Sequence, residues 1–429
     1  MYKKRIADQI LQEWIESCGC VLLEGSKWCG KTTSAEQIAG SVVYLADPND
    51  GVRNVQLART SPSFLLAGQT PRLIDEWQVV PTLWDAVRFE VDHRRAVGQF
   101  ILTGSAVPAK RDEIIHSGTG RITPVLMRPM SLWESEDSTG ELSLAMLFDR
   151  PEQLVAQSQI DIERLAFLIC RGGWPFALSV KSKKAALNQA IAYYSGVVGI
   201  GSGDNSDISR ADGIRRDPER VKRLMRSLSR HLGTQASLAT IAKDMQSNED
   251  ETLSEDIIAS YIKALKMIFV VEDMRAWNPN IRSKTAIRSA DTRYLVDPSI
   301  AAAALGIGPN DLMMDMKSFG LFYENMAVRD LRVYADALDG TVYHYRDKTG
   351  LECDAVIHLR NGHYGLVEIK IGGDNLIEEG AAALKQLAHK IDTDKMPAPS
   401  FMMVLIGVGN YAYRREDGVY VVPIGCLKP

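Results

Sequence analysis

One short stretch restricts the fold of this chain more than any other feature of the sequence. An apolar run over residues 21–23 leads into Gly25-x-x-x-x-Gly30-Lys31-Thr32, and a helical pattern over residues 34–39 follows. A buried strand, a glycine-rich loop and a helix in this order are the context of a phosphate-binding P-loop. A chance glycine-rich turn is the alternative, but the flanking patterns favour the P-loop, and we predict a nucleoside triphosphate site here.

The residue types of the loop match the chemistry of phosphate binding. Backbone N–H groups of the loop and of the helix start can point at phosphate oxygens, and Gly25 and Gly30 let the backbone approach the anion without a Cβ. Lys31 is expected to reach the β- and γ-phosphates during catalysis, and the Thr32 hydroxyl is expected to bind Mg²⁺. The residues expected to contact the nucleotide are Gly25, Ser26, Lys27, Trp28, Cys29, Gly30, Lys31, Thr32 and Thr33.

Two acidic residues end a later apolar strand. Residues 42–46 and 72–76 both have strand patterns, and the second ends in Asp75-Glu76. This arrangement matches a Walker B motif, in which Asp75 would hold Mg²⁺ through its water shell and Glu76 would polarise the attacking water. Asp-Glu pairs also occur as helix caps and plain turns, and the P-loop upstream is what favours the catalytic interpretation.

A strand over residues 99–105 ends in small polar residues, Thr103-Gly104-Ser105. Because ligands of open α/β sheets lie at the carboxyl ends of the strands, Ser105 or Thr103 is expected near the γ-phosphate, where it would sense the presence of that group. A simple strand-exit turn is the alternative interpretation.

A last strand of this region is predicted over residues 121–126, and it begins at a candidate charge-stabilising arginine. Arg121 is the first choice because it follows the flexible run Ser117-Gly118-Thr119-Gly120. It would act on the nucleotide of its own chain or of a neighbouring subunit. Arg111 and Arg128 are the other candidates.

The alternation of strands and helices over residues 1–150 predicts a parallel sheet with helices on both faces, the fold class of a P-loop NTPase. The chain resembles a prokaryotic family of AAA-type ATPases through Gly25–Thr32, residues 73–76, residues 101–105 and Arg121 followed by Arg128-Pro129-Met130-Ser131-Leu132-Trp133-Glu134. The resemblance covers nearly the whole chain. It implies ATP as the ligand, Mg²⁺-dependent hydrolysis and a C-terminal domain of unknown function with a restriction-endonuclease-like core. Trp28-Cys29 departs from the more basic loop interior usual in the family but leaves the phosphate-binding positions intact.

The middle of the chain is predicted to contain two parts. Residues 151–210 form a helical connector with a sharp turn at Arg171-Gly172-Gly173-Trp174-Pro175, which the family also shows. Residues 211–305 have the order of a winged helix-turn-helix. Helical patterns cover residues 221–232, 238–245 and 254–268, and a hairpin begins at residues 269–272 and returns at residues 292–296.

Double-stranded DNA is therefore a candidate partner, because winged helices often bind it by their third helix. That helix, however, carries Glu255 and Asp256 beside two lysines. The basic residues gather in the first helix and in the wing: Arg220, Lys222, Arg223, Arg226, Arg230, Arg275, Arg282, Lys284, Arg288 and Arg293. Phosphate contact by the wing is one interpretation, and a domain that only packs is the other.

Residues 306–429 show an αβββαβ order and a nuclease-like constellation. A helix begins at residues 322–328, strands cover 341–345, 353–359 and 364–370, and a helix over 380–391 and a strand over 401–406 follow. The set resembles a PD-(D/E)xK nuclease core, in which Glu324 is the helix acid, Asp354 and Glu368 bind the metal ion, and Lys370 orients the hydrolytic water. A site that binds DNA without cutting it and a structural ion network are the alternatives.

The turn between two of these strands tests the nuclease interpretation by geometry alone. A two-residue turn would direct Asp354 and Glu368 to opposite faces of the sheet. A three-residue loop over residues 360–362 puts the two acids directly opposite each other and pairs Leu359 with His363. We predict the three-residue loop, with Gly362 at positive φ.

Composition limits the partners and the compartment. The net charge of −4 excludes a global cationic field, so any nucleic-acid surface must be local. Six cysteines without Cys-x-x-Cys pairs or zinc spacing indicate free thiols in a reducing cytoplasm, and no apolar run is long enough to span a bilayer. We predict ATP binding and Mg²⁺-dependent hydrolysis coupled to a nucleic-acid partner, in a candidate homo-oligomer. The competing prediction is a nucleotide-operated regulatory switch whose inert C-terminal domain binds a protein.

Overall fold

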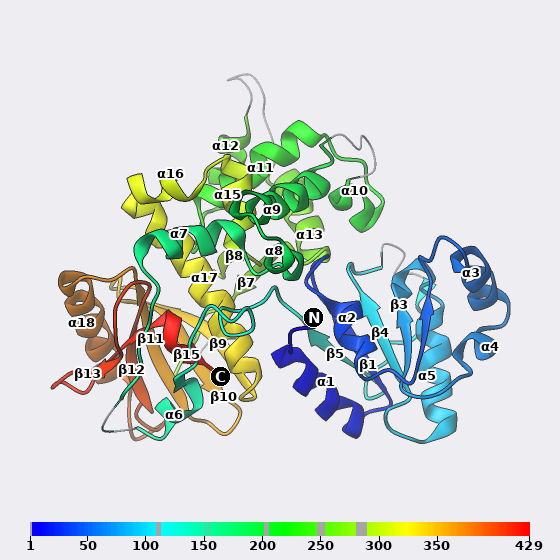
Figure 1. The fold of residues 1–429 in the computed structure, drawn as a ribbon, viewed down its shortest axis with the longest axis horizontal. Coiled ribbons are helices and arrows are strands. Elements are labelled where there is room, and N and C mark those ends of the chain that lie inside the picture. The colour runs from blue at the N-terminus through cyan, green and yellow to red at the C-terminus, as the bar shows by residue number, and fades with distance from the viewer. Residues whose placement is uncertain are drawn as a thin grey trace. The chain divides into compact units, whose positions relative to one another are not determined.

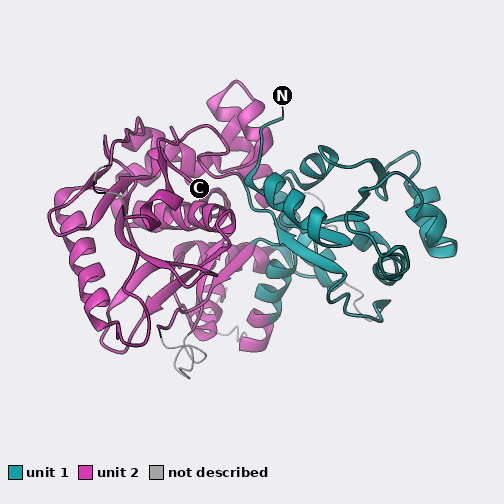
Figure 2. Cartoon of the chain, turned by 90° about the horizontal axis from the view of Figure 1, so that it is seen from below, with its two compact units in different colours: residues 1–129, 195–218, 260–270 teal, residues 130–194, 219–259, 271–429 magenta. Residues whose placement is uncertain are grey.

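The computed structural model describes residues 2–108, 113–150, 152, 154–200, 206–246, 254–279 and 290–429. The chain divides into two compact units (Figure 2). Unit 1 comprises Met1–Pro129, Ser195–Pro218 and Ser260–Val270, and unit 2 comprises Met130–Tyr194, Glu219–Ala259 and Val271–Pro429. No helix in these described ranges is both long enough and apolar enough to cross a membrane.

Unit 1 is built around a five-stranded sheet with helices on both sides (Figure 1). Its elements in chain order are α1 (Ile6–Ser17), β1 (Cys20–Glu24), α2 (Lys31–Glu36), β2 (Ser41–Tyr44), α3 (Gly51–Thr60), α4 (Pro62–Leu66), β3 (Arg72–Asp75), the 3₁₀ helix η1 (Trp77–Val79), α5 (Leu83–Arg94), β4 (Phe100–Gly104), β5 (Ile122–Leu126) and α10 (Asp207–Asp212). Two further helices, α9 (Lys183–Val198) and α13 (Glu255–Met267), divide between the two units, and the first residue of α11 (Pro218–Arg230) also belongs to unit 1.

All strands of unit 1 are parallel and lie in the order β2-β3-β4-β1-β5, which confirms the predicted parallel sheet. Val21 and Leu23 of β1 pack with residues of α1 and α2, whereas Cys20 and Leu22 pack with residues of α3, α4 and α5. Side chains alternate along a strand, so a continuous apolar strand needs helices on both faces. The order also puts β4 between β1 and β3, and the carboxyl ends of these three strands therefore meet at one edge.

Unit 2 combines a helical part with a six-stranded mixed sheet (Figure 1). Its remaining elements are β6 (Leu142–Ser143), α6 (Leu144–Phe148), α7 (Ile162–Arg171), α8 (Pro175–Ser179), α11 (Pro218–Arg230), α12 (Leu238–Met245), β7 (Val271–Met274), β8 (Thr292–Leu295), α15 (Pro298–Leu305), α16 (Pro309–Met314), α17 (Met316–Asp336), β9 (Gly340–Arg346), β10 (Glu352–Leu359), β11 (Tyr364–Lys370), α18 (Asp374–Lys390), β12 (Phe401–Ile406), β13 (Tyr413–Arg414), β14 (Tyr420–Pro423), the 3₁₀ helix η4 (Ile424–Cys426) and β15 (Leu427–Lys428).

The C-terminal part of unit 2 follows the predicted order from α17 to β12. β9, β10 and β11 are antiparallel neighbours, and β12 is parallel to β11. The sheet then extends through β14 to β13, which the sequence did not predict. β13 has two residues and β14 has four, so neither is long enough to show a periodic pattern.

Three helices begin earlier in the structure than the apolar pattern indicated. The starts are Lys31 instead of Ser34 for α2, Met316 instead of Phe322 for α17, and Asp374 instead of Gly380 for α18. Apolar periodicity marks only the part of a helix that faces a core, whereas its first turn depends on capping. At α17 the Asp315 carboxylate accepts the backbone N–H of Ser318 at 3.2 Å.

The region predicted as a winged helix has the expected order of elements. Helices α11, α12 and α13 precede the antiparallel pair β7–β8. The basic residues of the expected wing, Arg282, Lys284 and Arg288, lie outside the described residues. The predicted phosphate contact of the wing therefore stays a prediction.

A buried charge network fixes α17 in unit 2. The Arg329 guanidinium lies 2.7 Å from a carboxylate oxygen of Asp297 and 2.7 Å from one of Asp330, and all three side chains are buried. Asp330 also accepts the Leu132 N–H (2.9 Å), and Asp297 accepts the Gly173 N–H (2.9 Å). Burial raises the pKa of Asp330 to about 6. Because a buried charge without its partner is strongly destabilising, this network holds the segments around Leu132 and Gly173 against α17.

Candidate functional site

The backbone of the loop between β1 and α2 requires both of its motif glycines. Gly25 has φ +151°, and a Cβ there would lie 2.1 Å from the Met127 carbonyl oxygen. Gly30, the N-cap of α2, has φ +104°, a region that L side chains rarely adopt. Trp28 also has positive φ (64°), which is uncommon for a bulky residue, and its side chain is 53% exposed. The loop therefore has the tightly turned backbone expected of a phosphate-binding loop.

Lys31 is the buried cation of this loop. Its Nζ donates hydrogen bonds to the carbonyl oxygens of Gly25 (2.9 Å) and Ser26 (2.8 Å). The Ser26 hydroxyl is buried and has no hydrogen-bond partner among the described residues. Buried polar groups are almost always paired, and phosphate oxygens would pair with both this hydroxyl and the ammonium. The residues present thus fit the predicted nucleotide.

The two predicted magnesium ligands of unit 1 are in direct contact. Thr32 Oγ1 donates to Asp75 Oδ1 at 2.6 Å, and Thr103 Oγ1 of β4 donates to the same oxygen at 2.7 Å. Asp75 ends β3 and is buried. Hydroxyl and carboxylate oxygens are ligands that Mg²⁺ prefers, so the pair fits that ion. Nowhere in the described ranges, this site included, do three His, Cys, Asp or Glu side chains converge into a metal site.

Glu76 directly follows β3 in a left-handed backbone conformation (φ 57°, ψ 45°). Its Oε2 accepts hydrogen bonds from Ser105 Oγ (2.9 Å) and from Gln78 Nε2, and its backbone N–H donates to Thr103 Oγ1 (3.2 Å). Left-handed non-glycine residues are rare and concentrate at functional sites. The structure thus brings Ser105, the predicted sensor, into contact with the predicted base. Gln78 is a further contact that the sequence did not single out.

Several side chains of the loop turn away from the predicted phosphate position. Lys27 Nζ pairs with Asp207 of α10 at 2.5 Å, and the buried Cys29 Sγ donates to the Met127 carbonyl oxygen at 3.4 Å. The Thr33 side chain is exposed. For these positions, contact through the backbone N–H groups stays the prediction, and contact through the side chain does not follow from the structure.

The structure does not bring Arg121 to this edge of the sheet. Arg121 precedes Ile122, the first residue of β5, whereas β5 reaches the P-loop edge only at Leu126, roughly 15 Å further along the strand. Its guanidinium is 46% exposed and pairs with Asp92 of α5 at 2.8 Å. The expectation that Arg121 acts on the nucleotide of its own chain is therefore wrong, and contact with a second copy stays a prediction. Arg111 lies outside the described residues.

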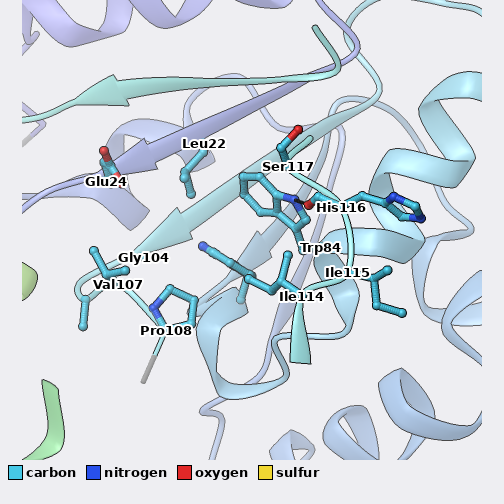
Figure 3. A pocket seen from close by; sticks show the side chains of 12 residues that line it. Leu22, Glu24, Trp84, Gly104, Val107, Pro108, Ile114, Ile115, His116 and Ser117 are labelled. Carbon is cyan, nitrogen blue, oxygen red and sulfur yellow. Dashed lines mark hydrogen bonds between the residues drawn. The ribbon is translucent and has the colours of Figure 1, made fainter. Parts of the chain in front are cut away.

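An apolar pocket of about 470 Å³ borders the same edge (Figure 3). Glu24 and Gly104 form one side of it, directly before Gly25 and Ser105 in the chain, and Trp84 lies across from them. The indole of Trp84 donates to the His116 carbonyl oxygen at 3.0 Å. The pocket thus shares its backbone with the phosphate loop and with the strand end that contacts Glu76.

In unit 2, the turn between β10 and β11 is the predicted three-residue loop. The Leu359 N–H donates to the His363 carbonyl oxygen at 2.8 Å, and Gly362 has φ +89°. The ladder continues in this register up to the pair Ala355 and Val367. The prediction of the loop and of its glycine is confirmed.

One step beyond that ladder, Asp354 and Glu368 meet at a single cation. Lys370 Nζ lies 2.6 Å from Glu368 Oε2 and 3.3 Å from Asp354 Oδ2, and Asp354 Oδ2 also accepts the Ile369 N–H at 2.7 Å. The three side chains border a pocket of about 400 Å³ beside α18. Two facing carboxylates are a donor pair for Mg²⁺, but the Lys370 ammonium takes the position between them.

Glu324 approaches this set from α17, and its carboxylate is held by a residue of β8. The Tyr294 hydroxyl donates to Glu324 Oε1 at 2.7 Å, and a Cβ on Gly233 would lie 2.5 Å from the same oxygen. Burial raises the pKa of Glu324, and the nearby Asp354 charge raises it further. Burial likewise raises the pKa of Glu368. The predicted helix acid is thus close to the other two acids but hydrogen-bonded elsewhere.

Exposed cations of the middle region form a stripe along α11. Lys222, Arg226 and Arg230 recur every four residues and therefore share one helix face, and we call them the α11 stripe. Arg226 and Arg230 are exposed, and Lys222 pairs with Glu219 at 2.6 Å. The α11 stripe is thus one cationic surface in the described part of this region.

Comparison with known proteins finds a similarity for part of unit 1. Residues 18–136 match a protein family described as an AAA domain. Residues 162–311 and 319–427 match two families described as domains of unknown function, DUF8612 and DUF4143. No curated protein matches the chain. Among solved structures, the Walker-type ATPase PABY2304 of Pyrococcus abyssi is 14% identical to this chain. The match covers 71% of this chain and 96% of that chain, with a TM-score of 0.42.

The matched range 18–136 contains the whole P-loop and the strand ends with Asp75, Glu76 and Ser105. This part of unit 1, a parallel sheet with flanking helices, is thus similar to an AAA domain, and the match supports ATP binding and hydrolysis. The match over residues 319–427 spans Glu324, Asp354, Glu368 and Lys370 and assigns them no activity.

The structure adds three contacts of the nucleotide site that sequence reasoning missed. They are Arg5 behind the loop, Gln78 at Glu76, and Asp207 at Lys27. The sequence carries little signal for any of them, because each depends on a side chain from a separate segment or turn meeting the motif in three dimensions. The one feature of the sequence near Arg5 is its basic run Lys3-Lys4-Arg5, and this composition is also that of an ordinary surface segment.

Proposed function

We propose that unit 1 binds ATP with Mg²⁺ and hydrolyses it. One observation carries this proposal: the phosphate loop with its lysine and threonine, Asp75 at the end of β3 and Glu76 directly after it all lie at the carboxyl edge of one parallel sheet. There, Thr32 and Asp75 are 2.6 Å apart, and Glu76 is oriented by Ser105 at 2.9 Å. Ligands of open parallel sheets bind at this edge.

The roles of the residues follow from their contacts. Lys31 and the loop N–H groups would bind the β- and γ-phosphates, and Thr32 and Asp75 would hold Mg²⁺, which neutralises charge on the phosphate oxygens. Glu76 accepts a proton from water as the water oxygen bonds to the γ-phosphorus, and the bond to the β-phosphate oxygen breaks, so that ADP leaves with the electron pair. Ser105 and Gln78 keep the Glu76 carboxylate in position.

Phosphate release from ATP by the purified full-length chain tests this function. We expect phosphate release in the presence of Mg²⁺ and none when EDTA removes the ion. ATP binding should remain measurable by calorimetry when the ion is removed. A chain that binds no ATP under these conditions would contradict the proposal.

We also propose that ATP turnover in unit 1 is coupled to duplex nucleic acid. The α11 stripe supports this partner, because cations at one-turn intervals can follow a phosphate backbone. The third helix, α13, begins instead with Glu255 and Asp256. The proposed contact thus lies on the first helix of the winged-helix region, with the wing as a second contact.

Charge reversal on the α11 stripe is expected to weaken duplex binding and flatten its salt dependence. The double variant Arg226→Glu and Arg230→Glu removes two phosphate contacts, so the slope of log K against log salt should fall by about 2. Fluorescence anisotropy with a labelled duplex over a series of salt concentrations measures it. The same reversal at Arg53 and Arg59, exposed on α3, changes the net charge equally and should leave the slope unchanged. If the wild type and both double variants had the same slope of log K against log salt, α11 would make no phosphate contact and would serve only in packing.

The second candidate function is a nucleotide-operated switch whose C-terminal domain is inert and binds a protein. It is favoured by the Lys370 ammonium, which occupies the position between Asp354 and Glu368. If the domain is instead a nuclease, Asp354→Asn should abolish cleavage of a labelled duplex in Mg²⁺, by about 10²-fold or more, while ATP hydrolysis is kept. No cleavage by the wild-type chain over a range of duplex and single-stranded substrates would favour the inert domain.

A further inference from the structure

The phosphate loop of unit 1 is held from behind by an arginine outside it. Arg5 lies directly before α1 and is buried, with 6% of its surface exposed. One terminal nitrogen of its guanidinium donates to the Cys29 carbonyl oxygen at 2.7 Å, and the other donates to the Arg128 carbonyl oxygen at 2.8 Å. Cys29 belongs to the loop, and Arg128 follows the carboxyl end of β5. A single planar cation thus links the loop to the end of the neighbouring strand.

The contact with Cys29 fixes the orientation of one peptide group in the loop. In a planar trans peptide the C=O of one residue and the N–H of the next point in opposite directions. Because the Cys29 carbonyl points at Arg5, the Gly30 N–H points away from Arg5, toward the opposite side of the loop. Gly30 has φ +104° and no Cβ, and the backbone freedom of glycine permits this peptide group to rotate.

Rotation of that peptide group would reverse the polarity that a phosphate meets. A flipped Cys29–Gly30 peptide would present a carbonyl oxygen, which repels an anion, in place of an N–H, which binds one. The hydrogen bond from Arg5 to the Cys29 carbonyl oxygen opposes this rotation. It is strong because its donor is charged and because it is buried, where the low dielectric strengthens hydrogen bonds. Holding the peptide before the nucleotide arrives also avoids an ordering cost on binding.

We propose that Arg5 is a positioning residue for phosphate binding, which keeps the Cys29–Gly30 peptide in the anion-binding orientation. This inference rests on the proposed function of unit 1 and deepens it. Arg5 acts through the loop backbone and touches no reacting atom. It should therefore affect nucleotide affinity and KM much more than kcat, as expected when an interaction contributes alike to the ground state and the transition state.

The neighbouring Tyr2 provides a matched comparison. Its hydroxyl contacts Asp8 at 2.7 Å and Ser34 of α2 at 2.8 Å, so it joins the start of α1 to α2 without touching a loop carbonyl. Tyr2→Phe loosens the same end of α1, whereas Arg5→Gln removes the charged contact with Cys29. The two variants separate a general loosening of α1 from the loss of peptide positioning.

Calorimetric titration with ATP and with ADP tests the proposal on four full-length proteins: the wild type, Arg5→Gln, Arg5→Lys and Tyr2→Phe. For each protein KM, kcat and the melting temperature without nucleotide are also measured. We expect Arg5→Gln to lose about tenfold or more in affinity for both nucleotides, with KM raised and kcat within about threefold. Arg5→Lys, which can still reach one carbonyl, should recover part of the loss and also serves if Arg5→Gln does not fold. Tyr2→Phe should bind like the wild type.

Two results would overturn the role of Arg5. One is wild-type nucleotide affinity in a folded Arg5→Gln protein. The other is an equal loss in Tyr2→Phe with no recovery by Arg5→Lys, which would make the effect one of general stability. A wild-type chain that binds neither ATP nor ADP would refute the proposed function itself, and the role of Arg5 with it.

Discussion

The Glu76→Gln variant is expected to hydrolyse ATP about 10²–10⁴-fold more slowly than the wild type, while it binds ATP with similar affinity. Glutamine keeps the size of the side chain and can still contact Ser105 and Gln78, which hold the carboxylate in the wild type. It cannot take a proton from the attacking water. Single-turnover phosphate release measures the chemical step, and calorimetry measures ATP affinity in the same preparation.

A carboxylate elsewhere on unit 1 controls for the change of charge. Glu90 lies on α5 and pairs with Arg94 at 2.8 Å, so Glu90→Gln removes the same charge away from the P-loop edge. The rate of ATP hydrolysis by Ser105→Ala should lie between the rates of Glu76→Gln and Glu90→Gln, because this variant loses one of the contacts that orient Glu76. Hydrolysis at the wild-type rate by Glu76→Gln would exclude this residue as the base.

The parallel sheet of unit 1 could be predicted because its signals are local. β1, β3 and β4 are apolar runs that are buried on both faces, and turn residues and amphipathic helices separate them. The order of the strands in the sheet is a different matter. That β4 lies between β1 and β3 is decided by contacts between distant segments, and it is this order that brings Thr103 to Asp75.

The β10–β11 hairpin could also be predicted in detail, down to its register. Gly362 allows a left-handed residue at the end of a three-residue loop, and the side-chain alternation on a strand then fixes which acids face each other. The register does not determine which cation the two acids bind. In the structure the ammonium of Lys370 pairs with both carboxylates. Lys370 is flexible and lies two residues from Glu368 on the same strand face, so it can form these ion pairs whether or not the site also binds a metal ion.

Side-chain direction is where sequence reasoning about the site was weakest. Arg121 follows a flexible run, which made it the first choice for the charge-stabilising arginine, yet it lies at the amino end of β5 and pairs with Asp92. Lys27 belongs to the phosphate loop, yet its ammonium pairs with Asp207 of α10, which is distant in the sequence. Arginine and lysine side chains are long enough to choose between several partners, so the sequence position of the Cα does not fix the position of the charge.

The ammonium groups of Lys27 and Lys31 point in different directions, so substituting each lysine tests which of them binds phosphate. Lys31→Ala is expected to abolish measurable ATP binding, a loss of at least about a hundredfold, because the ammonium would make charge-assisted contacts with two phosphates. In the structure the ammonium donates to the carbonyl oxygens of Gly25 and Ser26, so alanine would also remove this buried donor from both.

Lys27→Ala is the matched comparison, because it removes the same charge from the same loop. The Lys27 side chain is 43% exposed and pairs with Asp207, and an exposed ion pair of this kind contributes little. We therefore expect ATP affinity within about tenfold of the wild type in calorimetric titrations. If both alanine variants lost ATP binding equally, the loop would respond to its total charge, and the assignment of Lys31 as the phosphate ligand would be wrong. Loss of binding in Lys31→Ala alone would mean that the direction of the ammonium, and not its presence in the loop, determines phosphate binding.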